Sequence, residues 1–362
     1  MKHIHRLLVI AFFFIGLTSV SASVSDDHEQ EIHQENHVAK KFEPGNFIMD
    51  HVVDAYDWHV FSYGDFHFTA PLPIIVYSEN SGFHIFMSSE FNHGHSSFKG
   101  FELAKEGEYR GKVVEMIDGR QVRPFDISMT KNVVAMLFSM IFLLWLFVSI
   151  SKTYRLRKGQ EPKGIQAFLE PIIVFVIDDI AKSAIGEKKY KKFVPFLLTI
   201  FFFIWLNNMM GIVPFIPGGA NVTGNITITL VLALFTFVIT TINSNKHYWK
   251  DIFNTPGVPW WLKFPIPLMP FVELMGVFTK PFVLMIRLFA NITAGHMIVM
   301  AFISLIFIFG EISPLLGMGT SVVSVLFIIF MDILELLVAL IQAYVFTLLS
   351  ALYFGMAVEE EH

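Results

Sequence analysis

The sequence predicts an all-α polytopic membrane protein. We expect five membrane-crossing helices, the last two long and tilted, an in-plane helix, and a small exported N-terminal region with a few β-strands. Of the 362 residues, 54% are hydrophobic and 16% are charged, whereas soluble domains carry about 25% charged residues. The deficit is regional, because no Asp, Glu, Lys or Arg occurs from Phe193 to Asn245. That run accommodates two membrane helices of ~20 residues each.

The remaining composition narrows the classes of function. The net charge of −5 is mild and indicates neither a nucleic acid nor an acidic substrate as a partner. Because the chain has no cysteine, disulfides, haem-thiolate sites and iron–sulfur clusters are excluded. Fourteen histidines remain as possible ligands or proton carriers. We expect no cofactor.

Residues 1–22 have the pattern of a secretory signal peptide. Two basic residues, Lys2 and Arg6, precede a short apolar run, and small residues end the segment at Ala22. Cleavage there would make Ser23 the first residue of the mature chain and place it outside the cytoplasm. An uncleaved amphiphilic anchor is the alternative.

Three further regions follow along the chain. Residues 23–44 are acidic and nearly free of aromatics, which predicts a flexible tail. Residues 45–125 contain short apolar and aromatic stretches broken by turn residues, which predicts β-strands in a small exported domain. His93 and His95 could bind a metal there, but we favour solvated histidines. Residues 126–362 form the predicted membrane domain for ion translocation.

The membrane domain divides into five predicted crossings by hydropathy and charge. They are residues 132–151, 193–215, 226–242, 269–309 and 313–358. The positive-inside rule assigns the Lys- and Arg-rich loops between them to the cytoplasm. Those basic clusters lie at 152–163, 188–192 and 246–263. The topology therefore has an exported N-terminus and a cytoplasmic C-terminus.

Two parts of this domain are not simple spans. Residues 165–185 are apolar but include Glu170, Asp178 and Asp179, a mixture that favours an in-plane interfacial helix. Each of the last two crossings runs to about 40 residues, or ~60 Å of helix. That is twice the ~30 Å hydrocarbon core, so both helices must tilt or bend.

Ionisable residues lie inside the last two crossings, and a charge in a bilayer is a functional hypothesis by default. The polar set is Glu273, Lys280, Arg287 and His296 in the first, with Asp332, Glu335 and Gln342 in the second. Carboxylates and imidazoles can pass a proton near neutral pH, whereas a guanidinium, with a pKa above ~12, cannot be deprotonated. The pattern predicts a proton path with a barrier at Arg287. A structural ion pair between Arg287 and Glu335 is the alternative.

The motifs around these residues resemble the ATP synthase a chain family. The stretch KPFVLMIRLFANITAGHMI resembles the family's arginine helix, and LVALIQAYVFTLLSALYFGMAVEEEH resembles its last helix. WLNNMMGIVPF and NITITLVL are similar to the preceding helix pair through Asn208 and Asn225. The resemblance covers about residues 126–362 and does not extend to residues 23–125.

The resemblance implies a stator subunit that forms two proton half-channels against a ring of c subunits. Arg287 would be the essential charge barrier, and Glu273 would lie on the cytoplasmic exit. The implied ion pathway also includes Asn291, His296, Asp332, Glu335 and Gln342, with Asn208 and Asn225 as supporting polar residues. Implied partners are the c ring, the peripheral-stalk b subunit, the other ATP synthase subunits and the lipid of a bacterial inner membrane. The chain would make no bonds in ATP itself.

The chain departs from the family pattern at three positions. His296 stands where many bacterial members have a carboxylate, and Glu335 where they have a histidine, so the two types are exchanged. Gly211 replaces an acidic residue of some members, a loss that Asp332 could compensate. Proton and sodium ion remain alternatives as the transported ion.

Other functions remain to be weighed against this one. A secondary ion transporter would also bury charges, but it predicts internal repeats, and none are visible. A membrane metalloprotease predicts a ligand motif such as HExxH, which the sequence lacks. A purely structural assembly factor would not need Arg287.

Overall fold

The structure is a computed structural model of the chain. It describes residues 42–63, 66–94, 96–105, 107, 109–117, 119–157, 159–213, 218–254 and 268–359. The predicted signal peptide, most of the predicted acidic tail and His95 lie outside these residues. The unit that begins at Phe42 is described here by itself.

Within the described residues, five helices are long and apolar enough to cross a membrane. They are α3 (Lys131–Leu156), α6 (Val194–Ile212), α7 (Ile226–Asn243), α9 (Leu268–Ile312) and α10 (Pro314–Val358). Each falls on one predicted crossing, so the prediction of a mostly helical, multi-pass protein is confirmed. Helix α6 ends at Ile212, before the predicted residue 215. Val213 already has extended backbone, as expected for a residue that precedes a proline.

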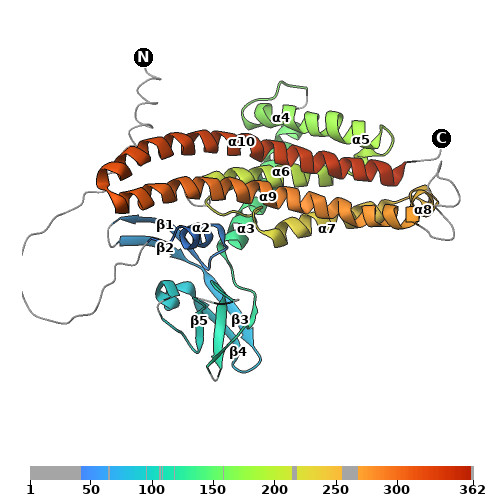
Figure 1. Cartoon of the computed structure of the whole chain (residues 1–362). Helices are drawn as coiled ribbons and strands as arrows, with labels where there is room; N and C mark the ends of the chain where they lie inside the picture. The colour runs from blue at the N-terminus through green and yellow to red at the C-terminus, as the bar shows by residue number, and fades with distance from the viewer. Residues whose placement is uncertain are drawn as a thin grey trace, which may run out of the picture. The chain divides into compact units, whose positions relative to one another are not determined.

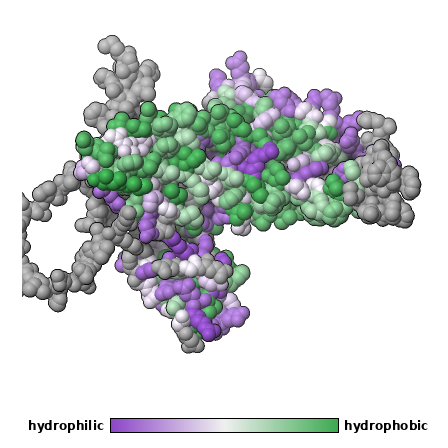
Figure 2. Space-filling model, in the orientation of Figure 1, coloured by the Kyte–Doolittle hydropathy of each residue, from purple (hydrophilic) through white to green (hydrophobic). Residues whose placement is uncertain are grey.

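The two C-terminal helices, α9 and α10, run side by side (Figure 1) and pack against each other and against α6 and α7. Each has 45 residues, which corresponds to ~68 Å of helix, more than twice the ~30 Å hydrocarbon core. Their tilt in a bilayer remains a prediction. Figure 2 shows a mostly hydrophobic surface over both helices, as expected for segments that face lipid.

The segment predicted as an in-plane helix is helical throughout. It consists of α4 (Ile165–Phe175), a stretch of wider π-helix (Val176–Lys182) and α5 (Ser183–Ile185). Val176 and Ile180 are fully buried in the core shared with α6 and α10, while Asp178 and Asp179 are exposed. This amphipathic pattern fits an interfacial helix, and its orientation in the bilayer remains a prediction.

The N-terminal region contains the predicted strands, after helix α2 (Pro44–Val52). The strands are β1 (Asp57–Tyr63), β2 (Phe66–Pro71), β3 (Pro73–Ser78), β4 (Gly82–Met87), β5 (Phe101–Leu103), β6 (Val113–Ile117), β7 (Arg120–Val122) and β8 (Phe125–Asp126). They form antiparallel sheets in the orders β1-β2, β4-β3-β8 and β5-β6-β7. A 3-10 helix (Ser88–Gly94) follows β4. Ile74, Phe91 and Phe101 are fully buried and form part of the core of this region.

Asp54 connects this region to the first membrane helix. Its carboxylate accepts hydrogen bonds from Thr130 Oγ1 (2.7 Å) and from the amide of Asn132 (3.1 Å). The first amides of a helix have no partner within the helix, and a negative charge there is favourable. Trp58 also packs against Ala135 of α3. The start of α3 is therefore held by the strand region.

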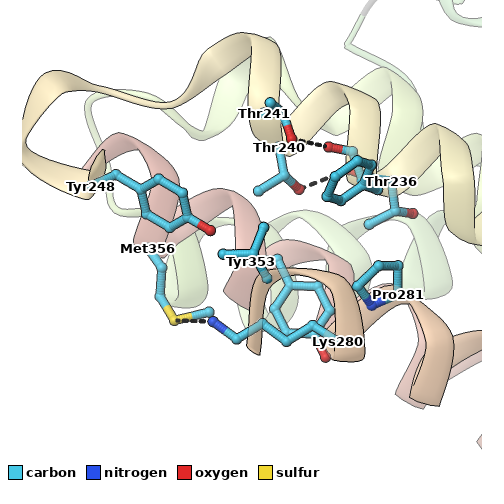
Figure 3. A pocket seen from close by; sticks show the side chains of 10 residues that line it. Thr236, Thr240, Thr241, Tyr248, Lys280, Pro281, Tyr353 and Met356 are labelled. Atoms are coloured by element: carbon cyan, nitrogen blue, oxygen red, sulfur yellow. Dashed lines mark hydrogen bonds between the residues drawn. The ribbon is translucent and has the colours of Figure 1, made fainter. Parts of the chain in front are cut away.

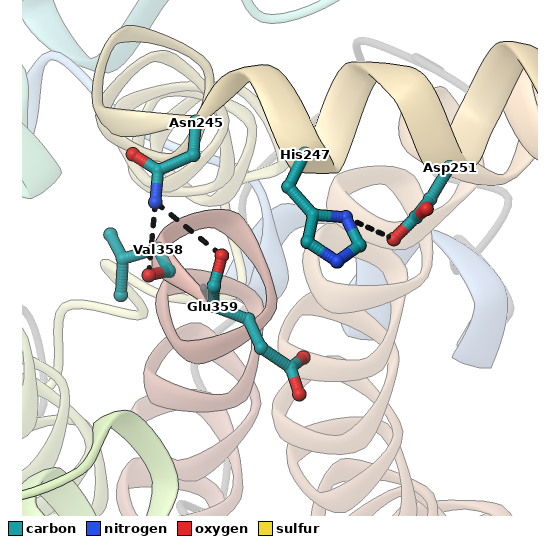
Figure 4. A network of polar contacts seen from close by, with 5 residues as sticks. All are labelled: Asn245, His247, Asp251, Val358 and Glu359. Atoms are coloured by element: carbon teal, nitrogen blue, oxygen red, sulfur yellow. Dashed lines mark hydrogen bonds and ion pairs between the residues drawn. The ribbon is translucent and has the colours of Figure 1, made fainter. Parts of the chain in front are cut away.

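The C-terminal end of α10 is held by residues of two segments that connect helices, including the residue that precedes α8 (Lys246–Phe253). Asn245 donates through its backbone amide to Ala357 O (2.8 Å) and through its side chain to Val358 O (3.0 Å) (Figure 4). Lys189 Nζ also donates to Val358 O at 2.8 Å, near the 3-10 turn Tyr190–Lys192. These donors satisfy carbonyls that the end of a helix leaves open.

Candidate functional site

A pocket of ≈ 350 Å³ lies between α6, α9 and α10. Five of the predicted site residues line it, namely Asn208, Asn291, His296, Glu335 and Gln342. The rest of its lining is mostly apolar, including Ile292 and Val338. The fold therefore gathers polar side chains from three helices around one space inside an apolar protein.

His296 and Glu335 form the closest charged contact in this pocket. His296 Nδ1 lies 3.2 Å from Glu335 Oε1, and both side chains are mostly buried. This distance is that of an ion pair, although within the described residues Oε1 accepts no hydrogen bond of good geometry. Asp332, one turn earlier on α10, lies within electrostatic reach of both groups. His296 and Glu335 are close enough to pass a proton directly.

Amide side chains extend the polar lining along the pocket. Asn291 Nδ2 donates to Gln342 Oε1 at 2.9 Å, and Gln342 is only 2% exposed. Asn208 Nδ2 donates to the backbone oxygen of Ala339 at 3.4 Å and accepts a hydrogen bond from Thr223. Thr223 ends an Asn-x-Thr triplet, which we interpret as structural, and the sequence alone did not mark it as a partner of Asn208.

Gly295 makes room for the Glu335 carboxylate. A Cβ atom at Gly295 would lie 2.2 Å from Glu335 Oε1, far inside van der Waals contact. Gly211 lies on the other side of His296, where a Cβ would be 3.4 Å from Nε2. An acidic side chain at position 211 would therefore contact His296 Nε2 directly. With glycine at this position, the Nε2 side of the imidazole has no carboxylate from α6.

We expect Gly295→Ala to slow ATP-driven proton pumping several-fold, because the added methyl group must push the Glu335 carboxylate away from His296. Overpacking of this kind costs about 1–3 kcal/mol. Gly276→Ala is the matched control on the same helix, since a Cβ there meets nothing within 4 Å. Adding Glu335→Asp to Gly295→Ala shortens the side chain and should restore part of the rate. Equal rates in Gly295→Ala and Gly276→Ala vesicles would refute the steric argument.

Arg287 lies on the opposite side of α9 from His296. The two residues are nine positions apart, or about 2.5 helical turns. Arg287 is exposed, and within the described residues its guanidinium has neither a hydrogen bond nor an ion pair. The alternative of a structural ion pair with Glu335 is therefore not found, because Glu335 contacts His296 instead.

A second, small pocket of ≈ 20 Å³ lies nearer the N-terminal end of α9, between α7, α8, α9 and α10. Figure 3 shows its lining, which includes Thr240, Tyr248, Lys280 and Tyr353. Lys280 Nζ lies 3.9 Å from Met356 Sδ and 5.8 Å from the centre of the Tyr353 ring. The space suffices for about one water molecule.

Glu273 lies near this second pocket. Burial raises the pKa of Tyr248, and the negative charge of Glu273 raises it further, so the two side chains are close. Glu273, Lys280 and Arg287 follow one another at intervals of seven residues and therefore share one face of α9. Tyr248 was missed in the sequence, since it lies on a short helix outside the predicted crossings.

Asn225 lies outside both pockets. Its side chain accepts a hydrogen bond from the amide of Thr227 at 3.0 Å and caps the start of α7. Asparagine is among the preferred residues at this position of a helix.

Two family models match the chain. One, described as ATP synthase A chain, matches residues 133–355, and the other, a domain of unknown function, matches residues 47–130. Similar curated proteins include ATP synthase subunit a of Chloroherpeton thalassium, 42% identical over 67% of this chain and 70% of the relative. ATP synthase subunit a 2 of Prosthecochloris aestuarii is 44% identical over 66% of this chain and 71% of the relative. ATP synthase subunit a of Myxococcus xanthus is 41% identical over 68% and 78%.

Proposed function

The chain belongs to the ATP synthase A chain family, and from this premise we propose that it is the ion-conducting stator subunit of a rotary F-type ATP synthase. Family membership makes it a multi-pass membrane subunit of that complex in a bacterial plasma membrane.

The outer half-channel runs through the larger pocket. Protons from outside reach the Asp332, Glu335 and His296 group and continue past Asn291 and Gln342. The ≈ 350 Å³ volume supports this role, because it can hold several waters at ~30 Å³ each. A carboxylate beside an imidazole supplies both an acceptor and a donor near neutral pH.

The barrier is Arg287, and its exposure is the observation on which the proposal mainly rests. An isolated arginine at the centre of a membrane helix costs from ~2.5 to ~17 kcal/mol, depending on method. A guanidinium that is exposed and unpaired within the described chain must therefore find its partner on another molecule. We propose a carboxylate on the rotating c ring as that partner.

The inner half-channel follows the face of α9 that begins with Glu273. From the ring, protons leave on the cytoplasmic side of Arg287, through the small pocket around Tyr248 and Tyr353 and then past Glu273. Each proton that crosses in this direction releases ~2.3 kcal/mol of free energy per 100 mV of membrane potential. We place the N-terminus outside and the C-terminus in the cytoplasm, as the basic loops favour. The b subunit binds on faces other than that of Arg287.

Cross-linking tests the proposed docking face. The native chain has no cysteine, so single cysteines can carry a photoreactive maleimide. Val283 and Ala290 are exposed and lie one turn from Arg287 on the same face of α9. We expect Val283→Cys and Ala290→Cys to cross-link to the c subunit in the assembled complex.

The control for this experiment is Ile141→Cys on α3, which is 66% exposed but lies on another helix. It should give no adduct with the c subunit. An intact complex in which positions 283 and 290 label only lipid or other subunits would contradict the proposed face. Mass spectrometry of the adducts identifies the partner.

A further inference from the structure

Two adjoining pockets lie along α3, away from both pockets of the proposed proton path, and we call the two together the groove. An apolar pocket of ≈ 390 Å³ lies between α3 and α6 and is lined in part by Met140, Leu144, Phe147 and Leu198. Its one hydroxyl, that of Thr199, already donates to Pro195 O at 2.7 Å. The pocket therefore offers no free polar group and suits a hydrocarbon chain.

A second pocket continues this groove toward the charged end of α3. It has a volume of ≈ 420 Å³ and shares Phe147 and Leu198 with the first. Its far end contains Ser151, Tyr154 and Arg155. Arg155 is exposed, and within the described residues its guanidinium has no ion pair. The groove is thus apolar at one end and positively charged at the other.

Helix α4 adds hydrogen-bond acceptors beside the charged end. Ile173 of α4 lines the second pocket, and Gln166 and Glu170 lie on the same face of that helix. Both lie within hydrogen-bonding reach of Tyr154. Gln166 is 7% exposed, and within the described residues Gln166 Oε1 and Glu170 Oε2 are buried without a hydrogen-bond partner. The single O–H of Tyr154 can donate to only one of these two acceptors at a time, so the other requires a further donor.

We propose that this groove binds one glycerophospholipid with an ammonium headgroup, of the phosphatidylethanolamine class. An acyl chain fills the space between Met140 and Phe147, the phosphate pairs with Arg155, and the ammonium group donates to Glu170 and Gln166. Arginine suits the first contact because its planar guanidinium matches a phosphate.

The length of the groove agrees with this ligand. From Met140 to Arg155 is 15 residues, or ~22 Å along the helix. One leaflet including its headgroups is also ~20–22 Å thick. A lipid seated here would fill the gap between α3 and the α6 core and so fix the first crossing against the rest of the membrane domain.

The test uses the purified ATP synthase complex, delipidated in detergent. Fluorescent phosphatidylethanolamine, phosphatidylcholine and diacylglycerol with identical acyl chains are titrated in parallel. Phosphatidylcholine has the same charges but no N–H donor, and diacylglycerol lacks the phosphate. We expect the ethanolamine lipid to bind most tightly and diacylglycerol most weakly.

Matched variants separate the groove from the general lipid surface. Arg155→Gln and Leu144→Trp should weaken binding of the ethanolamine lipid by about tenfold or more. Arg157→Gln and Ile141→Trp are the controls, because neither residue lines the groove, and Ile141 and Leu144 are each 66% exposed. Glu170→Gln should reduce the preference over phosphatidylcholine, whereas Glu161→Gln should not.

Three outcomes would overturn the proposal. They are equal binding by the groove variants and their controls, equal binding of the two zwitterionic lipids, and no binding to the wild-type complex because another subunit fills the groove. The Arg287→Lys complex should bind the lipid like wild type. Failure of the proton path and failure of the lipid site are therefore distinguishable.

Discussion

Proton-driven ATP synthesis should fall to background when Arg287 is replaced by lysine, while the complex still assembles. Both side chains are cationic, so the loss would come from chemistry other than net charge. The lysine ammonium is compact and can lose its proton when buried, whereas the guanidinium stays charged and presents a planar fork to a carboxylate. Because Arg287 is exposed, we expect this difference to act on the proposed c-ring partner and to leave the core of this chain intact.

Arg287→Ala should abolish synthesis as well and add a passive proton leak, because no fixed charge would then separate the two proposed half-channels. The assays are ATP synthesis and passive proton flux in membrane vesicles, with subunit content checked by immunoblot. Arg157→Gln serves as a control for loss of a cation, because Arg157 is exposed and lines neither pocket of the proposed proton path. Wild-type synthesis in Arg287→Lys would defeat the barrier hypothesis, and loss of assembly would indicate a structural role instead.

Much of the membrane fold was predictable because charge and hydropathy are local properties of a sequence. All five long apolar helices fall on predicted crossings, and the charged segment 165–185 is not among them. The seven-residue interval between Glu335 and Gln342 also predicts a shared face without any knowledge of packing, and both residues line the larger pocket. The strands after α2 follow from short apolar stretches between turn residues.

The parts that sequence reasoning missed depend on contacts between distant segments. Nothing local indicates that Gly295 borders the Glu335 carboxylate, which belongs to another helix. Thr223 reaches Asn208, and Tyr248 reaches the small pocket, only because their loop and short helix fold back on the membrane helices. Asn225 lies at a helix cap, where a polar residue in an apolar region has a purely local cause.

The resemblance implies that His296 and Glu335 are exchanged relative to many family members, and their geometry would permit such an exchange. The two side chains project from neighbouring helices into one pocket and meet at 3.2 Å. A proton path needs the carboxylate and the imidazole as a pair, and either helix can supply either group. Exchanging the two residues in this chain therefore tests whether protons of the proposed outer half-channel pass through this contact.

Replacing Glu335 with glutamine should slow ATP-driven proton pumping strongly, because the amide has the size of the carboxylate but cannot accept and release a proton near neutral pH. The double exchange His296→Glu with Glu335→His restores the pair in the arrangement of other members, and we expect it to recover part of the rate. His296→Gln with Glu335→Gln, which removes both titratable groups, is the control for that recovery.

Pumping is measured as ATP-driven acidification of inverted vesicles, with ATP hydrolysis as the check on the soluble head. A wild-type rate in Glu335→Gln, or no difference between the exchanged pair and the double glutamine variant, would show that protons enter by another route. Partial recovery in the exchanged pair alone would place the entrance at this contact.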